Sequence, residues 1–266
     1  MSNVISRDGT TIAFDRSGRG PALILVTGAL TTRADWSPLA AHLAPHFTVF
    51  TYDRRGRGQS GDTAPSTGGR EAVEREVEDL AVLLDEAGGS AYIFGHSSGA
   101  ALALEATLQL GEPVKKLALY EPPYNDDPAA QRAWGAYLHH LSELLAADRR
   151  GDAIALFRTL TGTPPAQIDA MRQAPFWAAL EALAPTLAYD HTALLGPDAA
   201  VPTETAARVR VPTLVIVGGA SFPFMGVTAH TLVDALPNGQ LATLDGQTHT
   251  ILPEILAPVL VAYFNG

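Results

Sequence analysis

Short runs of β-branched and aromatic residues alternate along the chain with longer stretches that mix apolar and polar positions. Gly, Pro, Asp or Ser residues bound each short run, which is typical of β-strands. Eight runs have this form: NVIS, TIAF, ALILVTG, FTVFTYD, AYIFG, KLALYE, TLVIVGG and GQLATLD. The first two are joined through RDG, a hairpin signal, so the pattern predicts eight strands that begin with an antiparallel pair.

The longer stretches carry apolar residues at helical spacing. In GREAVEREVEDLAVLLDEAG, Val73, Val77, Leu80 and Leu84 would share one face of a helix. Later strands alternate with helices of this kind, which favours crossover connections and parallel strands. The predicted fold class is therefore α/β, with a mostly parallel eight-stranded sheet flanked by helices on both faces.

Residues 122–209 interrupt this alternation. The segment has no convincing strand pattern, is rich in Pro and Gly, and contains helical patterns in AWGAYLHHLSELLAADRR and PAQIDAMRQAPFWAALEALA. We interpret it as an inserted helical lid over the carboxyl edge of the sheet. Residues 1–121 and 210–266 would then form the core domain.

The composition narrows the possible partners. Of 266 residues, 47% are hydrophobic and 17% are charged, which suits one globular domain with a sizeable core. The formal net charge is −10 and no basic run occurs, which argues against nucleic acid and anionic membranes and favours a small neutral or cationic ligand. The absence of cysteine excludes disulfides, thiolate metal sites and a cysteine nucleophile.

The expected location is the cytoplasm. The N-terminus MSNVISRDGT lacks the charged and apolar regions of a signal peptide, and no apolar stretch is long enough to span a bilayer. Nothing in the sequence indicates an oligomeric state.

One short motif carries candidate chemistry. In Gly95-His96-Ser97-Ser98-Gly99, Ser97 follows a predicted strand and precedes a predicted helix. A sharp strand-to-helix turn would hold Ser97 in a strained backbone conformation, and a side chain at either glycine would clash with the neighbouring strand or helix. This context favours Ser97 as a nucleophile over a small residue in a tight turn, and His96 is expected to pack beside the turn.

With this motif the chain resembles the α/β-hydrolase fold superfamily along essentially its whole length. The turn after ALILVTG, the segment YDRRGRGQSG, the turn at Ser97, a lid and a late histidine follow one another in the order of that family. The resemblance implies a serine nucleophile, a histidine base and an acid. It places the base at His249 in LDGQTHTILPEIL, between the last strand and the last helix.

The acid departs from the commonest pattern of the family. Most relatives carry it just after the strand that here reads TLVIVGG, where this chain has Ser221 and Phe222. A smaller group, including the fungal lactonases that open resorcylic macrolactones, places the acid at the end of the preceding strand, where this chain has Glu121. We therefore expect Glu121 to orient His249, with Asp245 as the alternative acid.

The resemblance also implies two backbone N–H groups that face the negative charge developing on the substrate oxygen. One would come from Ser98, at the start of the helix after Ser97. The other would come from TGAL, where Thr27 replaces the family's usual histidine; Ala29 is the expected donor and Leu30 the alternative.

The segment YDRRGRGQSG has glycines but does not indicate a cofactor. It lacks the strand-to-helix context and the following acidic residue of a dinucleotide site. Asp53 in this segment is expected to pair with Arg54 or Arg55 and hold the loop. No pair of histidines has the spacing of metal ligands, so neither a metal nor a cofactor is expected.

Aromatic residues of the predicted lid and of the loop after TLVIVGG suit a hydrophobic acyl or aryl group. Together with the loop after ALILVTG they supply the residues expected to contact substrate. These residues are Leu30, Trp134, Tyr137, Trp177, Phe222, Phe224 and Met225.

These features predict a serine hydrolase that cleaves a carboxylic ester or lactone of a hydrophobic small molecule through an acyl-enzyme intermediate. Two other classes remain open. One is an enzyme that uses the same residues for non-hydrolytic chemistry, such as cofactor-free oxidation, a lyase reaction or a cyclisation in natural-product metabolism. The other is a binding protein in which an incomplete triad only holds a ligand.

Overall fold

The computed structural model describes residues 2–63 and 69–266; Met1 and residues 64–68, which belong to the predicted core segment 1–121, lie outside this description. Its centre is an eight-stranded sheet in the order β1-β2-β4-β3-β5-β6-β7-β8. β2 pairs antiparallel with β1 and β4, and all other pairs are parallel, which confirms the predicted fold class. The strands are β1 (Ser2–Ile5), β2 (Thr11–Gly18), β3 (Ala22–Val26), β4 (Thr48–Tyr52), β5 (Ala91–His96), β6 (Val114–Tyr120), β7 (Thr213–Gly218) and β8 (Gly239–Leu244).

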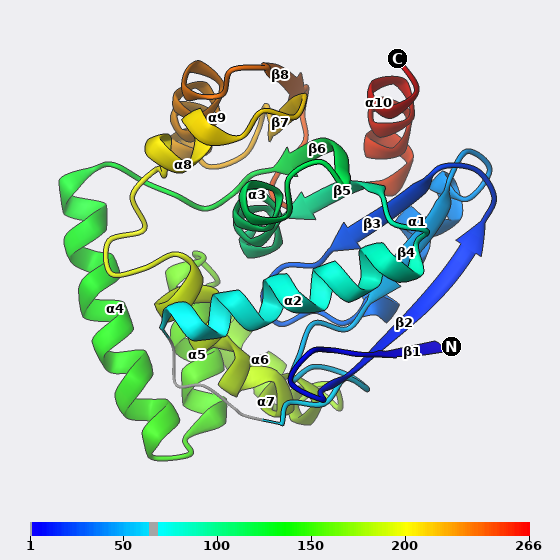
Figure 1. Cartoon of the computed structure of the whole chain (residues 1–266). Coiled ribbons are helices and arrows are strands. Elements are labelled where there is room, and N and C mark those ends of the chain that lie inside the picture. The colour runs from blue at the N-terminus through cyan, green and yellow to red at the C-terminus, as the bar shows by residue number, and fades with distance from the viewer. Residues whose placement is uncertain (1, 64–68) are drawn as a thin grey trace.

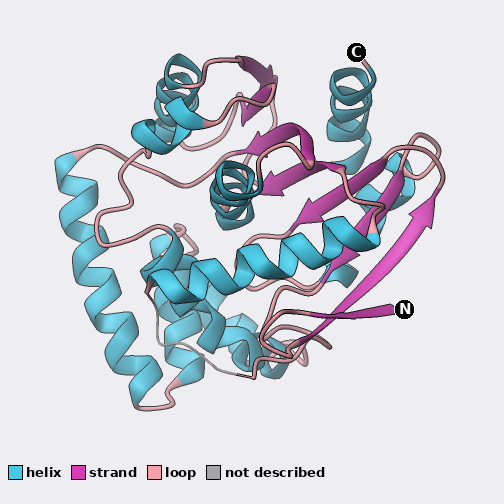
Figure 2. Ribbon diagram, viewed as in Figure 1, coloured by secondary structure: helices cyan, strands magenta, loops and turns pink. Residues whose placement is uncertain are grey.

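Helices cover both faces of the sheet, as Figures 1 and 2 show. On one face Leu39, Leu260 and Phe264 pack with Phe94 of β5, and on the other face Leu80 belongs to the larger apolar cluster. The helices on the first face are α1 (Ser37–Leu43) and α10 (Pro253–Asn265). The short helix η1 (Arg33–Trp36) directly precedes α1. The helices on the second face are α2 (Arg70–Glu86), α3 (Ser98–Leu110), α8 (Thr203–Arg208) and α9 (Pro223–Ala235).

The apolar patterns of the sequence match this arrangement. β4 and β7 are buried at every position, because helices cover both faces of the sheet at these strands. In α2, Val73, Val77, Leu80 and Leu84 are buried, as their helical spacing predicted. The alternation of strands and helices therefore arises from burial on both faces of one sheet.

A helical insertion, defined here as the residues between β6 and β7, contains the segment for which helices were predicted. Asp127 begins its first helix: its side chain accepts the N–H groups of Ala129 and Ala130, and Pro128 takes the first helical position. Its elements are α4 (Pro128–Ala146), α5 (Arg150–Leu160), α6 (Pro165–Arg172), α7 (Trp177–Leu183), η2 (Ala184–Thr186), η3 (Ala188–Leu194) and α8.

The helical insertion has an apolar core of its own, which includes Leu141, Ile154 and Leu187. From the loop after β3, Leu30 belongs to this cluster and Ala29 packs against it. The insertion thus packs against the carboxyl ends of the central strands, where Figure 1 shows α4 to α7 gathered beyond the sheet.

The turn between β5 and α3 is tightly packed. Ser97 has φ 56° and ψ −128°, a conformation that side-chain-bearing residues rarely adopt. A Cβ atom on Gly95 would lie 2.5 Å from the carbonyl oxygen of Gly99, and one on Gly99 would lie 2.3 Å from the carbonyl oxygen of Val26. Both glycines are therefore needed for the close approach of β5, α3 and the end of β3.

Three buried arginines follow β4. Arg54 donates two hydrogen bonds to Glu76 of α2, at 2.7 and 2.6 Å, and a third to Asp190 of η3 at 2.7 Å. Arg57 donates to the other oxygen of Asp190 at 2.8 Å. Arg55 makes a similar bidentate contact with Asp79 of α2, at 2.8 and 2.7 Å. These pairs join the sheet, α2 and the helical insertion.

The expected pairing of Asp53 with Arg54 or Arg55 is wrong. Its carboxylate instead forms an ion pair with the side chain of Arg33 and accepts the backbone N–H groups of Arg33 and Gln59, at 2.7 and 2.9 Å. Successive side chains of an extended segment point to opposite sides, so Asp53 and Arg54 face different neighbours. Arg55 is instead held by Asp79 of α2.

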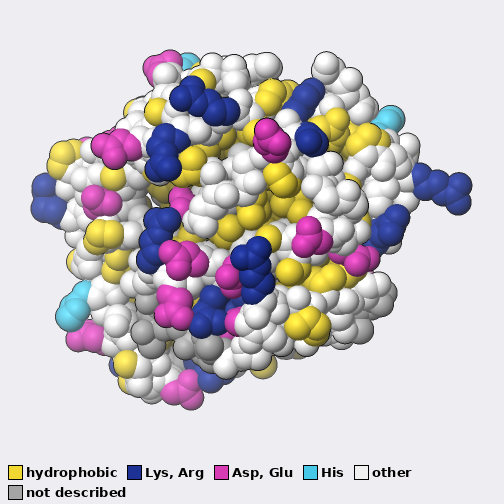
Figure 3. All heavy atoms as spheres, viewed as in Figure 1, with side chains coloured by type: hydrophobic (Ala, Val, Ile, Leu, Met, Phe, Trp, Pro, Cys, Tyr) yellow, Lys and Arg dark blue, Asp and Glu magenta, His cyan; other side chains and the backbone are white. Residues whose placement is uncertain are grey.

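The surface carries mixed charge. On the face in Figure 3 basic and acidic side chains alternate, and along α2 they form the pairs Arg70–Glu74 and Arg75–Glu71. Across residues 2–63 and 69–266, every helix is too short or too polar to cross a membrane.

Gly99→Ala is expected to destabilise the fold by about 1–3 kcal/mol, because the new methyl group would overlap the backbone at the end of β3. Gly135→Ala is the matched control: a Cβ atom there has no neighbour within 4 Å, and alanine in this helix should stabilise by about 0.5–1 kcal/mol. Urea unfolding of both variants gives the two free energies. Equal effects would contradict the packing described for the turn.

Candidate active site

A cavity of about 940 Å³ opens at the carboxyl ends of the strands, between the loops of the sheet and the helical insertion. Ser97, in the turn after β5, and His249, in the loop after β8, both line it. The other predicted site residues that line it are Ala29, Leu30, Ser98, Trp134, Phe222, Phe224 and Met225.

Two residues expected to contact substrate, Tyr137 and Trp177, are not among the described residues that line this cavity. Tyr137 lies behind Trp134, with ring centroids 5.2 Å apart, and its hydroxyl is hydrogen-bonded to Nδ1 of His191 at 2.8 Å. Trp177 is buried within the insertion and donates its indole N–H to Glu181 at 3.0 Å. Both side chains pack inside the insertion, because helical spacing identifies apolar residues but not the neighbour that each one meets.

Glu121 and His249 are in direct contact. The Nδ1–H group of His249 donates to Oε2 of Glu121 at 2.6 Å. The Glu121 carboxylate is buried and also accepts the backbone N–H of Gly218 at 2.8 Å and the hydroxyl of Ser221 at 2.9 Å. Asp245, in contrast, is exposed just after β8. Ser221 occupies the position where most relatives would carry the acid, and its hydroxyl binds the carboxylate of Glu121, which directly follows β6.

The loop that carries His249 is held from two sides. The Tyr120 hydroxyl donates to the Thr248 carbonyl at 2.6 Å, and Nε2 of His96 donates to the His249 carbonyl at 2.9 Å. Burial and the nearby His249 lower the pKa of His96 to about 3, so this side chain is neutral. His96 also packs on Trp36, with ring centroids 5.5 Å apart. It therefore packs beside the turn at Ser97, as expected from the sequence. These contacts fix the backbone of His249 without using its Nε2 atom.

The loop after β3 is held by the buried arginines. The Gly28 carbonyl accepts hydrogen bonds from Nη1 of Arg57 at 3.0 Å and from the Thr31 hydroxyl at 2.8 Å. The Thr27 carbonyl accepts one from Arg54 at 3.1 Å. Leu30 has φ 55°, which turns the chain sharply towards the insertion. The positions of the backbone groups in this loop therefore depend on charges that lie beneath it.

Asp190 supplies the anion that both arginines share. It is fully buried, and burial alone would raise its pKa, but the charges of Arg54 and Arg57 hold that pKa well below the usual range. Asp190 belongs to η3, so the helical insertion contributes directly to the support of the loop after β3.

Several residues of the cavity were not predicted: Phe157, Arg158, His191 and Leu195. His191 is buried against aromatic rings, and burial lowers its pKa to about 4. It lies in a π-helical turn, whose extra residue per turn breaks the spacing on which helical patterns depend. Phe157 and Arg158 lie in α5, between the two stretches for which helical patterns were identified, and fall only within the general prediction of a helical insertion.

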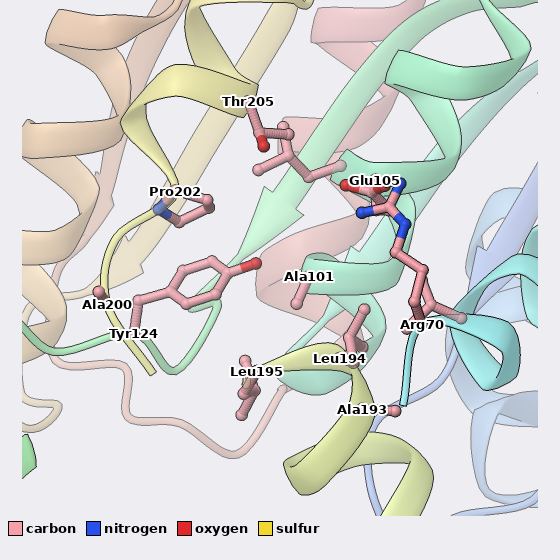
Figure 4. Close-up of a pocket in the computed structure, with 12 residues that line it drawn as sticks. Arg70, Ala101, Glu105, Tyr124, Ala193, Leu194, Leu195, Ala200, Pro202 and Thr205 are labelled. Carbon is pink, nitrogen blue, oxygen red and sulfur yellow. Dashed lines mark hydrogen bonds and ion pairs between the residues drawn. The ribbon is translucent and has the colours of Figure 1, made fainter. Parts of the chain in front are cut away.

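A second cavity of about 250 Å³ lies beside the first, and Leu195 lines both. Figure 4 shows Arg70 beside Glu105 at one side of it and Tyr124 at the other. Arg70 and Glu105 form an ion pair at 3.1 Å, and the cavity contains neither Ser97 nor His249. The larger cavity is therefore the candidate active site. The part of the chain that the structure describes holds no cluster of His, Asp and Glu side chains suited to a metal ion.

Comparisons with known proteins agree with the fold. A model of the Alpha/beta hydrolase family matches residues 23–262. A solved alpha/beta hydrolase from Sphaerobacter thermophilus is 50% identical, with a TM-score of 0.85 over 99% of this chain and 100% of that chain.

Two curated relatives match part of the chain. An uncharacterized hydrolase of Bacillus subtilis is 36% identical over 115 residues, and N-formylmaleamate deformylase of Pseudomonas putida is 33% identical over 106 residues. These matches cover 43% and 40% of this chain and 42% and 39% of the relatives, so the chain spans less than half the length of these two relatives.

Acidification from pH 7 to pH 5 is expected to destabilise the fold by about 1–2 kcal/mol for each of His96 and His191. Their folded pKa values, about 3 and about 4, lie below the ordinary value of 6.5, so the unfolded chain binds protons that the folded chain does not. The stability present above pH 6.5 is thus lost as the pH falls towards the folded values.

Urea unfolding at a series of pH values measures this dependence. His191→Gln should reduce the slope between pH 5 and 6.5, whereas His140→Gln, on the exposed side of α4, should leave it unchanged. A free energy of unfolding that does not vary between about pH 7 and pH 5 would contradict the neutral state of both histidines in the folded chain.

Proposed function

Because the chain belongs to the alpha/beta hydrolase family, we propose that it is a serine hydrolase that cleaves a carboxylic ester or lactone of a hydrophobic small molecule. The reaction passes through an acyl-enzyme on Ser97. The observation that carries the proposal is the hydrogen bond between His249 and Glu121 beside the cavity that Ser97 lines.

The proposed chemistry begins with Ser97. Its oxygen attacks the carbonyl carbon of the substrate while Nε2 of His249 takes the hydroxyl proton. Glu121 holds the other nitrogen, Nδ1, in its protonated form and stabilises the imidazolium that results. His249 then returns the proton to the leaving alkoxide. In the second half of the reaction a water molecule attacks the acyl carbon and gives a proton to His249. The bond between the acyl carbon and the Ser97 oxygen then breaks, His249 returns the proton to that oxygen, and the carboxylic acid is released.

Glu121 is the better candidate acid because its carboxylate is already aligned. The backbone N–H of Gly218 binds Oε1, and the hydroxyl of Ser221 binds Oε2. These two contacts hold the carboxylate so that Oε2 also accepts the hydrogen bond from His249. The carboxylate is buried, so its interaction with a charged imidazolium is screened little by water. Asp245 is exposed to solvent and lacks this setting.

The oxyanion hole follows from the hydrogen bonds of Gly28. The C=O of Gly28 and the N–H of Ala29 belong to one trans peptide and point in opposite directions. Since Arg57 and Thr31 bind the carbonyl oxygen, the N–H of Ala29 is directed away from them. Ser98, the first residue of α3, contributes the second N–H group. The two donors stabilise the negative charge of the tetrahedral intermediate.

The helical insertion acts as the lid of this site. Trp134, Phe157 and His191 of the insertion line the cavity together with Phe222, Phe224 and Met225, which follow β7. In this proposal residues 122–209 are the cap over a core made of residues 1–121 and 210–266. The apolar walls favour a hydrophobic acyl or aryl group.

A fluorophosphonate is expected to label Ser97 alone, because activation of a serine requires both a base and an oxyanion hole. Intact mass and peptide mapping identify the labelled residue, and p-nitrophenyl esters and lactones measure turnover. Ser97→Ala and His249→Ala should both lose labelling and turnover, with kcat lower by on the order of 10⁴–10⁶. Ser142→Ala, on an exposed position of α4, is the control. Undiminished labelling of Ser97→Ala would overturn the assignment.

Glu121→Gln is expected to lower kcat by roughly 10²–10⁴-fold with little change in substrate affinity, since an amide cannot stabilise the imidazolium. Asp245→Asn should have an effect of less than about 3-fold, because that carboxylate is exposed. Steady-state kinetics and melting temperatures of both variants separate loss of function from loss of fold. A severe defect in Asp245→Asn with a normal Glu121→Gln would transfer the role to Asp245.

A further inference from the structure

Arg158 is set apart among the charged residues of the larger cavity. It lies in the last turn of α5 and lines the same cavity as Ser97 and His249. Its Nε–H group is buried without a hydrogen-bond partner among the described residues. Among residues 2–63 and 69–266, no carboxylate acts on its guanidinium, and burial is the cause that lowers its pKa.

The other buried guanidinium groups show what this chain does when an arginine serves the fold alone. Arg54, Arg55 and Arg57 each donate to at least one buried carboxylate, at 2.6–2.9 Å. Nε of Arg57 also lacks a partner among the described residues, but Asp190 neutralises the charge of that guanidinium. A donor buried without an acceptor costs about 1–3 kcal/mol, more for a charged group. Arg158 carries such a cost in the wall of a cavity, where an anionic ligand would supply the opposite charge that the described residues do not give its guanidinium.

The end of α5 accounts for the charge of Arg158 only in part. The carbonyl end of a helix favours a cation, but this general attraction provides no acceptor for the buried Nε–H. Burial lowers the pKa of Arg158, which is the direction expected of a cation that lacks an anion.

Two carboxylates also line the cavity, and neither neutralises Arg158. Asp35 is exposed and accepts the backbone N–H and hydroxyl of Thr32, at 2.7 and 3.0 Å. Asp198 is exposed and accepts the N–H of Ala200 at 3.1 Å. Both are engaged within their own turns.

We propose that Arg158 binds a carboxylate of the substrate, so that the preferred substrates are esters or lactones that carry a free carboxylate, such as half-esters of dicarboxylic acids. This inference rests on the proposed function of Ser97 and His249. The planar guanidinium presents paired N–H groups that match the two oxygens of a carboxylate. The ring of Phe157 lies against the guanidinium, with its centroid 5.9 Å from the guanidinium carbon.

The net charge of −10 favours neutral or cationic ligands, whereas Arg158 points to an anion. Distance and screening decide between the two. Charges on the surface are largely screened beyond about 8–10 Å in physiological salt. A guanidinium in direct contact with the ligand, in a partly buried wall, is screened much less. The local group therefore outweighs the overall charge.

The test compares two esters with the full chain: mono-p-nitrophenyl glutarate, which carries a free carboxylate, and p-nitrophenyl pentanoate, which is neutral. Arg158→Gln should lower kcat/KM for the glutarate ester by roughly 10- to 100-fold, mainly through KM, because a charge-assisted hydrogen bond is lost. Activity on the pentanoate ester should change by less than about 3-fold. Arg158→Lys, which keeps the charge but not the planar fork, should recover part of the loss.

Arg132→Gln is the matched control, because it removes one positive charge from an exposed position outside the cavity. It should leave the ratio of the two kcat/KM values unchanged. An equal loss of activity on both esters in Arg158→Gln, or an equal change of the ratio in Arg132→Gln, would overturn the proposal.

Direct binding separates this proposal from the proposed function. Titration calorimetry with glutarate, in a Ser97→Ala background, should show binding that weakens at least about 10-fold on Arg158→Gln. If neither ester is hydrolysed but glutarate binding depends on Arg158, the hydrolase proposal fails while the carboxylate site stands. If the pentanoate ester is hydrolysed and glutarate binding is independent of Arg158, the carboxylate proposal fails alone.

Discussion

The carboxylate of Asp190, shared between Arg54 and Arg57, is the interaction on which the rest of the structure depends. All three side chains are buried, so each charge needs an opposite charge beside it. Arg54 is also bound to α2 through Glu76, and both arginines bind carbonyls of the loop after β3. The helical insertion, the sheet and the candidate oxyanion loop are therefore joined at one point, and the cavity between them has a defined shape.

A second constraint appears where three neighbouring strands end. β3, β5 and β6 lie side by side in the sheet, and each is followed by a residue with positive φ: Leu30 at 55°, Ser97 at 56° and Glu121 at 46°. Such conformations are costly for residues with a side chain and gather where the surrounding structure holds them. The chain thus turns sharply at the edge where the candidate oxyanion loop, nucleophile and acid lie together.

The candidate base reaches this edge from β8, on the far side of β7. Gly218 at the end of β7 makes this possible, because a Cβ atom there would lie 2.4 Å from the carbonyl oxygen of Gln247. The same glycine donates its N–H to Glu121, and Ser221 adds a hydroxyl. The end of β7 thus carries small groups that bind an acid from β6, which gives a physical reason for the absence of a carboxylate at Ser221.

The sequence alone determined the elements and the residues with distinctive local context. Strands, helices and the insertion follow from periodicity, which is a local property, and Ser97 stood out because it lies between a strand and a helix. The resemblance to the α/β-hydrolase fold then singled out Glu121 and His249, at the end of a strand and in the loop after one. Tertiary structure decided the rest. Asp53 pairs with Arg33. Tyr137 and Trp177 pack inside the insertion. The cavity is lined by Phe157, Arg158 and His191. A pattern shows which residues share a face, but only the packing of helices and strands decides what that face meets.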